Sequence, residues 1–425
     1  MTTKPDQAPR PTFTRRGILA VGGAAIIGAA GGYAIADRRS NPAPAASPSA
    51  APSPTSTPDA TPATTAEVGS GATTVPFYGT HQAGIATPAA LLQTFIGLDL
   101  VGRDAANAEA VLRIVTDDAA RLTQGEAALG DTEPELAAHP GGLTVTVGLG
   151  RSLFARIGLE DRLPPQLEPI PAFETDRLEE QWGQTDLLLQ VGSDDAVTLA
   201  HTIRMLTKDL STLTRVRWIQ PGFRSPMPAT PGSSATRNLM GQVDGTINPA
   251  PASADFDTVV WIPEGPDWVA GGTVLVLRRI RMLMDTWDAL DRVTKETVMG
   301  RTLDTGAPLG GTSEADPVPF DAVDDVGLPV IPQDAHIRVA HAATTEEMIL
   351  RRPYSYDNGM AKGTNDIGLL FAAYMRDPAG QFVPMQRRIA QSDAFNRWNT
   401  TIGSAVYLVP PGAAEGGFIA EGLFR

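Results

Sequence analysis

The order of strands and helices repeats once along the chain, and this repeat limits the fold more than any other sequence feature. Short apolar or alternating runs predict strands, and apolar residues three and four positions apart predict helices. In the first half we expect strands at 91–100, 143–149, 186–191 and 215–219, and helices at 108–122 and 196–210. In the second half we expect strands at 273–283, 336–341, 348–354, 368–375 and 405–409, and helices at 285–298 and near 387–402. Each half approximates β-α-β-β-α-β, which predicts an α+β class of tandem ferredoxin-like domains with antiparallel sheets.

The expected organisation has four parts. Arg15 and Arg16 precede a Gly- and Ala-rich apolar run that ends near Ala36, a pattern typical of a twin-arginine signal peptide over 1–36. A membrane-spanning helix is the alternative, although its many small residues would make a weak anchor. Residues 37–74 are rich in Pro, Ala, Ser and Thr, which predicts a disordered linker. An N-terminal domain is then expected at 75–230 and a C-terminal domain at 231–425, joined by the Pro- and Gly-rich stretch 221–232.

These parts predict a destination outside the cytoplasm. A twin-arginine signal would be read by the twin-arginine translocation machinery, which carries proteins that have already folded. We therefore expect an extracellular, periplasmic or cell-envelope location. The chain has no cysteine, which fits a compartment where free thiols are oxidised.

Composition also excludes several kinds of chemistry. Without cysteine there are no disulfides, no thiolate ligands or nucleophiles, no covalently attached haem and no iron–sulfur cluster. The formal net charge of -14 argues against nucleic acid as a partner. A metal ion would need a His, a carboxylate or a cofactor, and the chain has five histidines: His81, His139, His201, His336 and His341.

Two short stretches combine residues that could carry chemistry. Residues 241–249 contain Asp244-Gly245 and then Asn-Pro, which in isolation indicate only a turn. The second stretch contains His336 and His341, followed by Arg351 and Arg352. In a strand, His336 and His341 would point to opposite faces, so we expect only one of them to be a ligand. Each feature alone is most often an ordinary turn or a solvated surface.

Together these stretches resemble the dye-decolourising haem peroxidases. The run 241–249 is similar to the GxxDG motif of that family, and residues 336–341 and 350–356 are similar to its proximal-histidine and distal-arginine segments, in the same order. The resemblance continues at 75–85, 368–371, 381–384 and 402–406, so that it spans essentially the whole chain after the linker. With the export signal, the chain is most similar to the secreted bacterial branch.

The resemblance implies non-covalent haem b in the C-terminal half and a role for each matching residue. His336 corresponds to the axial ligand of iron, Asp244 to the distal acid/base and Arg351 to the distal arginine. Gly245, Thr246 and Ile247 match the segment against the porphyrin. Phe371 and Leu369 are expected in the apolar distal wall, and Asp393 as the carboxylate that hydrogen-bonds His336.

The implied activity is a hydrogen peroxide-dependent oxidoreductase that oxidises dyes, phenolics or similar organic donors through a ferryl intermediate. Heterolysis of peroxide requires a proton to move between the two oxygens, which an ionised Asp244 can do, and a cation beside the leaving oxygen, which Arg351 supplies. An aspartic acid has an ordinary pKa near ~3.9, so we expect an acidic pH optimum.

Several alternatives stay open. Arg352 is a second candidate for the distal arginine, and Pro353 stands where some relatives have a distal Asn. Bulky donors could be oxidised through surface aromatics, for which the candidates are Tyr354, Tyr356, Trp398 and Tyr407. Other functions are a deferrochelatase-like release of iron from porphyrin, or a haem carrier without catalysis. The resemblance is compatible with a homo-oligomer.

Overall fold

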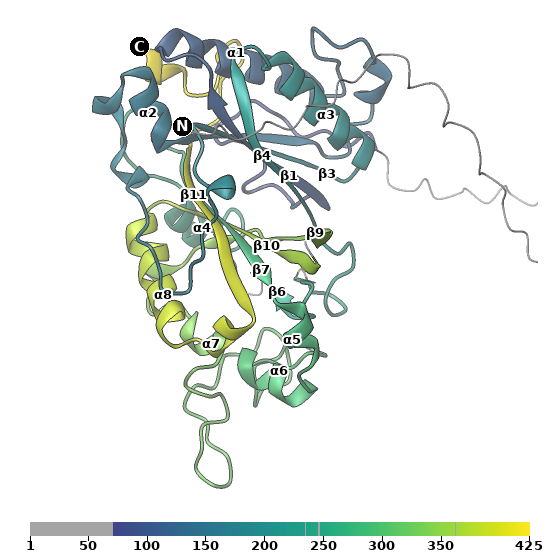
Figure 1. Cartoon of the computed structure of the whole chain (residues 1–425), viewed down its shortest axis with the longest axis vertical. Helices are drawn as coiled ribbons and strands as arrows, with labels where there is room; N and C mark the ends of the chain where they lie inside the picture. The colour runs from purple at the N-terminus through teal and green to yellow at the C-terminus, as the bar shows by residue number, and fades with distance from the viewer. Residues whose placement is uncertain (1–70, 234, 245–246, 362) are drawn as a thin grey trace, which may run out of the picture. The chain divides into compact units, whose positions relative to one another are not determined.

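The computed structural model describes residues 71–425, except 234, 245–246 and 362 (Figure 1). The predicted signal peptide and nearly all of the predicted linker lie outside the described residues, as do Gly245 and Thr246. The last residues of the predicted linker are described. Gly71 and Thr73 accept backbone hydrogen bonds from Gly141 and Gly142.

The first half of the described chain contains four antiparallel strands and two long helices. The order is β1 (Leu92–Leu100), α1 (Ala105–Leu122), β2 (Thr144–Gly150), α2 (Arg151–Ile157), β3 (Leu187–Ser193), α3 (Ala196–Asp209) and β4 (Thr214–Phe223). In the sheet the strands lie in the order β2-β3-β1-β4, the ferredoxin-like arrangement. Asp104 and Asp195 cap α1 and α3 by accepting hydrogen bonds from backbone amides, which explains where the two helices begin.

The second half repeats this arrangement with additions. It contains the short strands β5 (Thr236–Arg237) and β6 (Val243–Asp244), then α4 (Ala254–Val260), β7 (Thr273–Met282), α5 (Met284–Asp288), α6 (Arg292–Met299), α7 (His336–Val339), β8 (Leu350–Arg351), β9 (Tyr354–Ala361), β10 (Thr364–Met375), α8 (Pro378–Ser392) and β11 (Asn399–Val409). Its four main strands lie in the order β11-β7-β10-β9. The expected fold class is therefore confirmed.

The two four-stranded sheets join edge to edge into one closed antiparallel barrel of eight strands. β11 pairs with β2, and β4 pairs with β9. Both junctions are short, since β4 and β9 are paired only at Phe223 and Ser355. Apolar residues from both halves fill the space between the sheets, among them Phe95, Trp218, Leu277, Tyr374 and Tyr407. Strands β2 and β3 are buried along their whole length because the barrel interior covers one face and the helices α1 and α3 the other.

Four secondary-structure predictions are wrong. The single strand expected at 348–354 is interrupted after Arg351, and β9 begins at Tyr354. Residues 336–341 alternate in polarity as a strand does, but no described strand pairs with them, and residues 336–339 form α7, where Ala340 donates to the carbonyl of His336. The helix expected at 285–298 is broken into α5 and α6, because Asp291 caps a new helix there. The helix expected near 387–402 begins instead at Pro378 and ends at Ser392, and residues 399–402 belong to β11. Asp377 caps α8, and Pro378 is favourable in its first turn.

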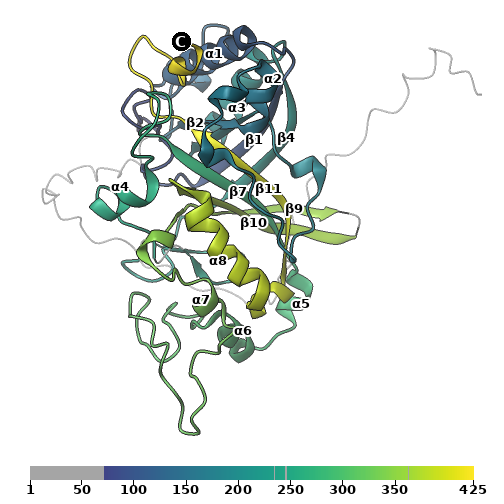
Figure 2. The same cartoon turned by 90° about the vertical axis from the view of Figure 1, so that its left-hand side faces the viewer.

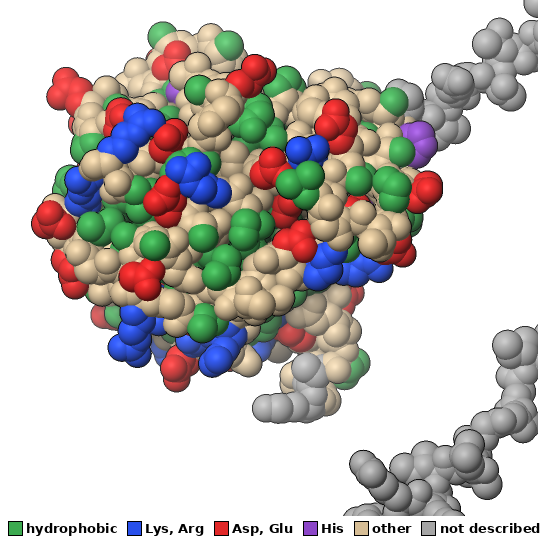
Figure 3. Space-filling model, turned by 90° about the horizontal axis from the view of Figure 1, so that it is seen from above, with side chains coloured by type: hydrophobic (Ala, Val, Ile, Leu, Met, Phe, Trp, Pro, Cys, Tyr) green, Lys and Arg blue, Asp and Glu red, His purple; other side chains and the backbone are tan. Residues whose placement is uncertain are grey.

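The helices of the second half cover its sheet on one side. Figure 2 shows α8 in front of β7, β10 and β11, with α7 and α6 below it. A long loop between α6 and α7 projects from this end of the molecule in both views. Acidic and basic side chains alternate on the face shown in Figure 3. Among the residues that the structure describes, no helix is long and apolar enough to span a membrane.

Asp118 is a buried carboxyl group between α1 and α3. It is 4% exposed, and one of its oxygens has no hydrogen-bond partner within the described part of the chain. Burial, and repulsion from the carboxylates of Asp209 and Asp117, raise the pKa of Asp118 to about 7, against the opposing effect of Lys208. The folded protein therefore holds a proton that the unfolded chain releases near pH ~4.

We predict that Asp118→Asn stabilises the protein in a pH-dependent way. Because the folded pKa is raised, the favourable contribution of Asp118 is complete below pH ~4 and is lost as the pH rises towards 7. The variant should therefore melt at least about 2 °C above the parent at pH 8, and this difference should shrink towards pH 4. Differential scanning calorimetry at pH 8, 6 and 4 measures it, with Asp325→Asn, at an exposed loop position, as the control. A difference that does not change with pH would contradict the assignment.

Candidate active site

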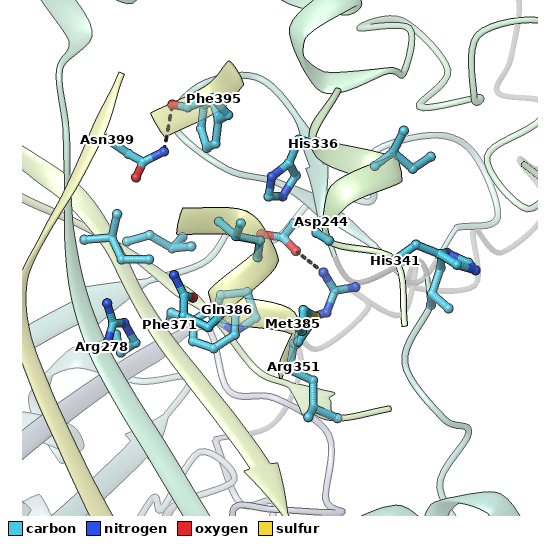
Figure 4. A pocket seen from close by; sticks show the side chains of 18 of the residues that line it. Asp244, Arg278, His336, His341, Arg351, Phe371, Met385, Gln386, Phe395 and Asn399 are labelled. Atoms are coloured by element: carbon cyan, nitrogen blue, oxygen red, sulfur yellow. Dashed lines mark hydrogen bonds and ion pairs between the residues drawn. The ribbon is translucent and has the colours of Figure 1, made fainter. Parts of the chain in front are cut away.

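A cavity of about 410 Å³ lies in the second half, between the sheet and the helices α7 and α8 (Figure 4). On α8, Phe382, Met385 and Ile389 line it at a spacing of three and four residues, which places them on one face of the helix. On β7, Arg278, Ile280 and Met282 line it at a spacing of two, as expected for one face of a strand. Pockets of this size accommodate small-molecule ligands and cofactors.

His336 enters the cavity from the first residue of α7. Its Nδ1 lies 2.6 Å from Oδ2 of Asp393, so the ring donates a hydrogen bond to a carboxylate that is 1% exposed. The other oxygen of Asp393 accepts the backbone amide of Phe395 at 2.8 Å, at the start of the 3₁₀ helix η6 (Ala394–Arg397). The predicted partner of His336 is therefore confirmed, and Nε2 remains available to bind a metal ion.

The surroundings of His336 affect its charge. Burial opposes protonation of the ring, but attraction to Asp393 and the hydrogen bond that the ring donates to it outweigh burial and raise the pKa of His336. The carboxylate that stabilises the imidazolium also increases the electron density of the neutral ring. A metal ion bound at Nε2 would therefore have a strongly donating ligand.

Asp244 and Arg351 line the same cavity, although they are far apart in the sequence. Asp244 ends the short strand β6, and Arg351 ends β8. Oδ1 of Asp244 lies 3.9 Å from Nη1 of Arg351, an ion pair longer than a hydrogen bond (Figure 4). Both side chains are partly exposed, so a small molecule in the cavity can reach the carboxylate and the guanidinium together.

Asn248 holds these two segments together, a role that the sequence analysis did not assign. Its side-chain amide donates to the carbonyl of Arg351 at 2.7 Å and accepts from the amide of Arg351 at 3.0 Å. The side chain thus satisfies both backbone groups of Arg351, as a neighbouring strand would. The signal was present as the Asn-Pro pair after Asp244-Gly245, but its partner could not be identified without the fold.

The alternative residues lie elsewhere. Arg352 donates to the backbone carbonyl of Thr87 at 2.6 Å and is not among the cavity-lining residues. His341 lines the exposed rim, where its ring packs edge-on against Phe320. Figure 4 shows this ring pointing away from His336 and Arg351. The structure therefore groups His336, Asp244 and Arg351, and it separates Arg352 and His341 from them.

Some of the other predicted site residues line the cavity, and others lie outside the described residues. Phe371, Leu369, Ile247 and Pro353 line the cavity, whereas Gly245 and Thr246 lie outside the described residues. The four aromatic residues considered for surface oxidation are all buried, which contradicts their expected exposure: Tyr354, Tyr356, Trp398 and Tyr407.

Polar groups at the cavity wall test whether haem b fits. Gln242 is 4% exposed and lies two residues before Asp244, and among the residues that the structure describes its Nε2 has no hydrogen-bond partner. Arg301 also lines the cavity and donates to the backbone carbonyls of Gly306 and Glu314. An amide donor and a guanidinium in the lining of one cavity suit carboxylates, which haem b carries as its propionates. A single available imidazole and apolar walls suit the rest of the group. The cavity therefore fits haem b.

Arg278 is a third arginine in the cavity lining, on its inner wall. It is almost fully buried and forms an ion pair with Asp176, a residue of the first half. Its guanidinium also lies over the ring of Phe173, 5.4 Å from the centroid. The amide of Arg177 donates to Thr401 of β11, which fixes this segment beside the cavity. One wall of the cavity thus depends on the first half of the chain.

In the described part of the chain, no group of three or more His, Asp or Glu side chains is arranged to hold a metal ion.

Comparison with known proteins agrees with the geometry. Residues 82–224 match the family model described as "Dyp-type peroxidase, N-terminal", and residues 235–414 match "Dyp-type peroxidase, C-terminal". The chain is 39% identical to a dye-decolorizing peroxidase of Thermobifida fusca over the full length of both proteins. It is 35% identical to a deferrochelatase of Escherichia coli K12, covering 80% of this chain and 84% of that protein. The solved structure of ferric DtpA from Streptomyces lividans is 40% identical, with a TM-score of 0.79, and covers 83% of this chain and 97% of that one.

We predict that Asp393→Asn raises the reduction potential of the haem iron while haem stays bound. Loss of the charged acceptor makes His336 a weaker donor, so the Fe(III)/Fe(II) reduction potential should rise. Spectroelectrochemistry measures the potential.

His336→Ala should lose haem or its axial ligand, and His341→Ala is the matched control with an unchanged absorption spectrum. An unchanged spectrum in His336→Ala, or a changed one in His341→Ala, would refute the ligand assignment.

Proposed function

The chain belongs to the DyP-type peroxidase family, and from this premise we propose that His336 holds the haem iron while Asp244 and Arg351 act on hydrogen peroxide. The protein is a haem-dependent peroxidase that uses hydrogen peroxide as oxidant. The observation that carries the residue assignment is the convergence of these three side chains in one cavity. The physiological donor is proposed to be a dye, a phenolic or a similar organic molecule.

Each residue has a distinct task in this proposal. When bound, haem supplies the redox centre that peroxide oxidises and the organic donor reduces. His336 binds the iron through Nε2, and Asp393 keeps the proton on Nδ1. Gln242 and Arg301 bind the propionates, since both present hydrogen-bond donors at the cavity wall.

Asp244 and Arg351 divide the work on peroxide between proton transfer and charge stabilisation. The carboxylate of Asp244 takes the proton from one peroxide oxygen and delivers it to the other, which leaves as water. Arg351 stabilises the negative charge on the leaving oxygen with a permanently charged guanidinium. Their separation of 3.9 Å keeps the carboxylate and the guanidinium close enough for both to contact one peroxide molecule. Asn248 fixes the backbone from which Arg351 extends.

A second candidate function is release of iron from haem. The similarity to deferrochelatases supports it. Both reactions would use the same cavity, but they leave different products. Incubation with haem, hydrogen peroxide and an organic donor gives oxidised donor in a peroxidase and metal-free porphyrin in the alternative, and the fluorescence of the porphyrin separates the two.

We also propose that the protein is exported through the twin-arginine route. The support is Arg15-Arg16 before an apolar, small-residue run, followed by the Pro- and Ala-rich stretch that would link the signal to the enzyme. Export of the folded protein would let haem be bound before transport. The proposed location is extracellular, periplasmic or at the cell envelope.

We predict that Asp244→Ala and Arg351→Leu each slow the reaction with hydrogen peroxide by about 100-fold or more, while haem stays bound. Stopped-flow absorption of the Soret band measures the second-order rate constant between pH 3 and 8. The parent should react fastest at acidic pH. Arg215→Leu, at an exposed position of β4, is the control and should react like the parent. Full peroxide reactivity in both site variants, or an optimum above neutrality, would refute the distal assignment.

We predict that replacing Arg15 and Arg16 together by lysine keeps the protein in the cytoplasm, because the translocation machinery reads the arginine pair. Cell fractionation followed by immunoblotting measures the distribution. A companion variant with Arg38 and Arg39 changed to lysine should still be exported. Export of the Arg15/Arg16 variant at the parent level would exclude the twin-arginine route.

A further inference from the structure

Methionine is concentrated around the proposed peroxide site. The chain has no cysteine, so its 11 methionines carry all of its sulfur. Four of them line the cavity: Met282, Met299, Met348 and Met385. A thioether is readily oxidised by two electrons to a sulfoxide, and a cavity that admits peroxide brings the oxidant to these side chains.

Of the four, Met385 lies on α8, the helix that forms one wall of the cavity. It lies one turn after Phe382 and one turn before Ile389, and all three line the cavity. Its side chain is 8% exposed, so bulk solvent has little access to it. Arg351 and Asp244, which form an ion pair, line the same cavity as Met385, and all three are labelled in Figure 4. The thioether therefore borders the cavity that would hold peroxide.

We propose that Met385 is a sulfoxidation site of this enzyme, oxidised by peroxide held at Arg351 and Asp244 when no organic donor is available. The proposal rests on the proposed roles of these two residues. It adds a covalent modification of the cavity wall by the substrate of the enzyme itself.

The step balances with the groups at hand. A sulfur lone pair forms a bond to one peroxide oxygen while the O–O bond breaks, and the second oxygen leaves with the bonding electrons. Arg351 stabilises that leaving oxygen, and Asp244 transfers to it the proton of the oxygen now on sulfur. The products are methionine sulfoxide and water: the thioether loses two electrons and one molecule of peroxide gains them.

The modification would alter the cavity. Sulfoxide is polar, whereas the neighbouring wall contains Phe371 and Phe382. Oxidised Met385 would therefore disturb the packing of α8 against this wall. In an enzyme exposed to peroxide without a donor, the fraction of Met385 converted to sulfoxide would therefore increase with that exposure.

The sequence allows the oxidation to be read at single-residue resolution. Trypsin should release residues 377–387, a peptide in which Met385 is the only methionine. Three other methionines provide references. Met240 is as buried as Met385, at 4% exposed, but does not line the cavity. Met227 and Met360 are 68% and 67% exposed and report oxidation by bulk peroxide.

The haem-loaded protein is treated with small additions of hydrogen peroxide, with and without an oxidisable phenol, and is digested and analysed by mass spectrometry. We expect Met385 to oxidise about ten-fold faster than Met240, and the phenol to suppress this difference. Arg351→Leu, and the more conservative Arg351→Lys, should slow oxidation of Met385 by about ten-fold while Met227 and Met360 react as in the parent. In Met385→Leu, the intact mass should gain one oxygen fewer.

The outcomes separate this proposal from the proposed function. If the Arg351 variants keep full Soret reactivity with peroxide, the distal assignment fails. If they lose that reactivity while Met385 oxidises no faster than Met240 in the parent, only the sulfoxidation proposal fails. An equal number of oxygen additions in Met385→Leu and the parent would also overturn it.

Discussion

The hydrogen bond between His336 and Asp393 is the contact on which the proximal side of the cavity depends. Asp393 follows the last residue of α8, caps η6 with one oxygen and accepts the imidazole with the other. One buried carboxylate therefore ends a helix, begins the next turn and sets the tautomer of the proposed iron ligand. Because α8 also carries the apolar side chains of the cavity wall, the orientation of the ligand and the shape of the wall are fixed by the same element.

The distal side of the cavity is held in place differently, through hydrogen bonds to the backbone. Asp244 and Arg351 extend from strands of only two residues each, which have little stability of their own. Asn248 supplies the missing support, since its side chain pairs with both backbone groups of Arg351. The distance between the carboxylate and the guanidinium is thus controlled through the backbone, and both side chains remain free to respond to peroxide. The proximal ligand, by contrast, is held directly through its side chain.

The sequence predicted the fold class because its strands are long and strongly apolar, as β1, β7 and β10 show. It failed where local pattern and tertiary context disagree. The alternation of residues 336–341 suits a strand, yet no neighbouring strand is available there, and a short helix satisfies its own hydrogen bonds. The ambiguity between Arg351 and Arg352 likewise could not be removed by strand parity alone, because it depends on Thr87, far away in the sequence, which accepts a hydrogen bond from Arg352. The proximal carboxylate was predicted correctly, but its double role as a cap was not.

The ion pair of Arg278 and Asp176 links the two halves of the chain, so the second half is not independent of the first. A protein that consisted of only the second half would retain every residue of the proposed catalytic centre and the sequence motifs that contain these residues. It would nevertheless lose Asp176, the carboxylate that pairs with Arg278, and Phe173, the ring over which that guanidinium lies. None of the proposed catalytic residues lies in the first half, which instead supplies the counter-ion of Arg278. Any replacement of the first half would therefore have to keep an acidic side chain at the position of Asp176.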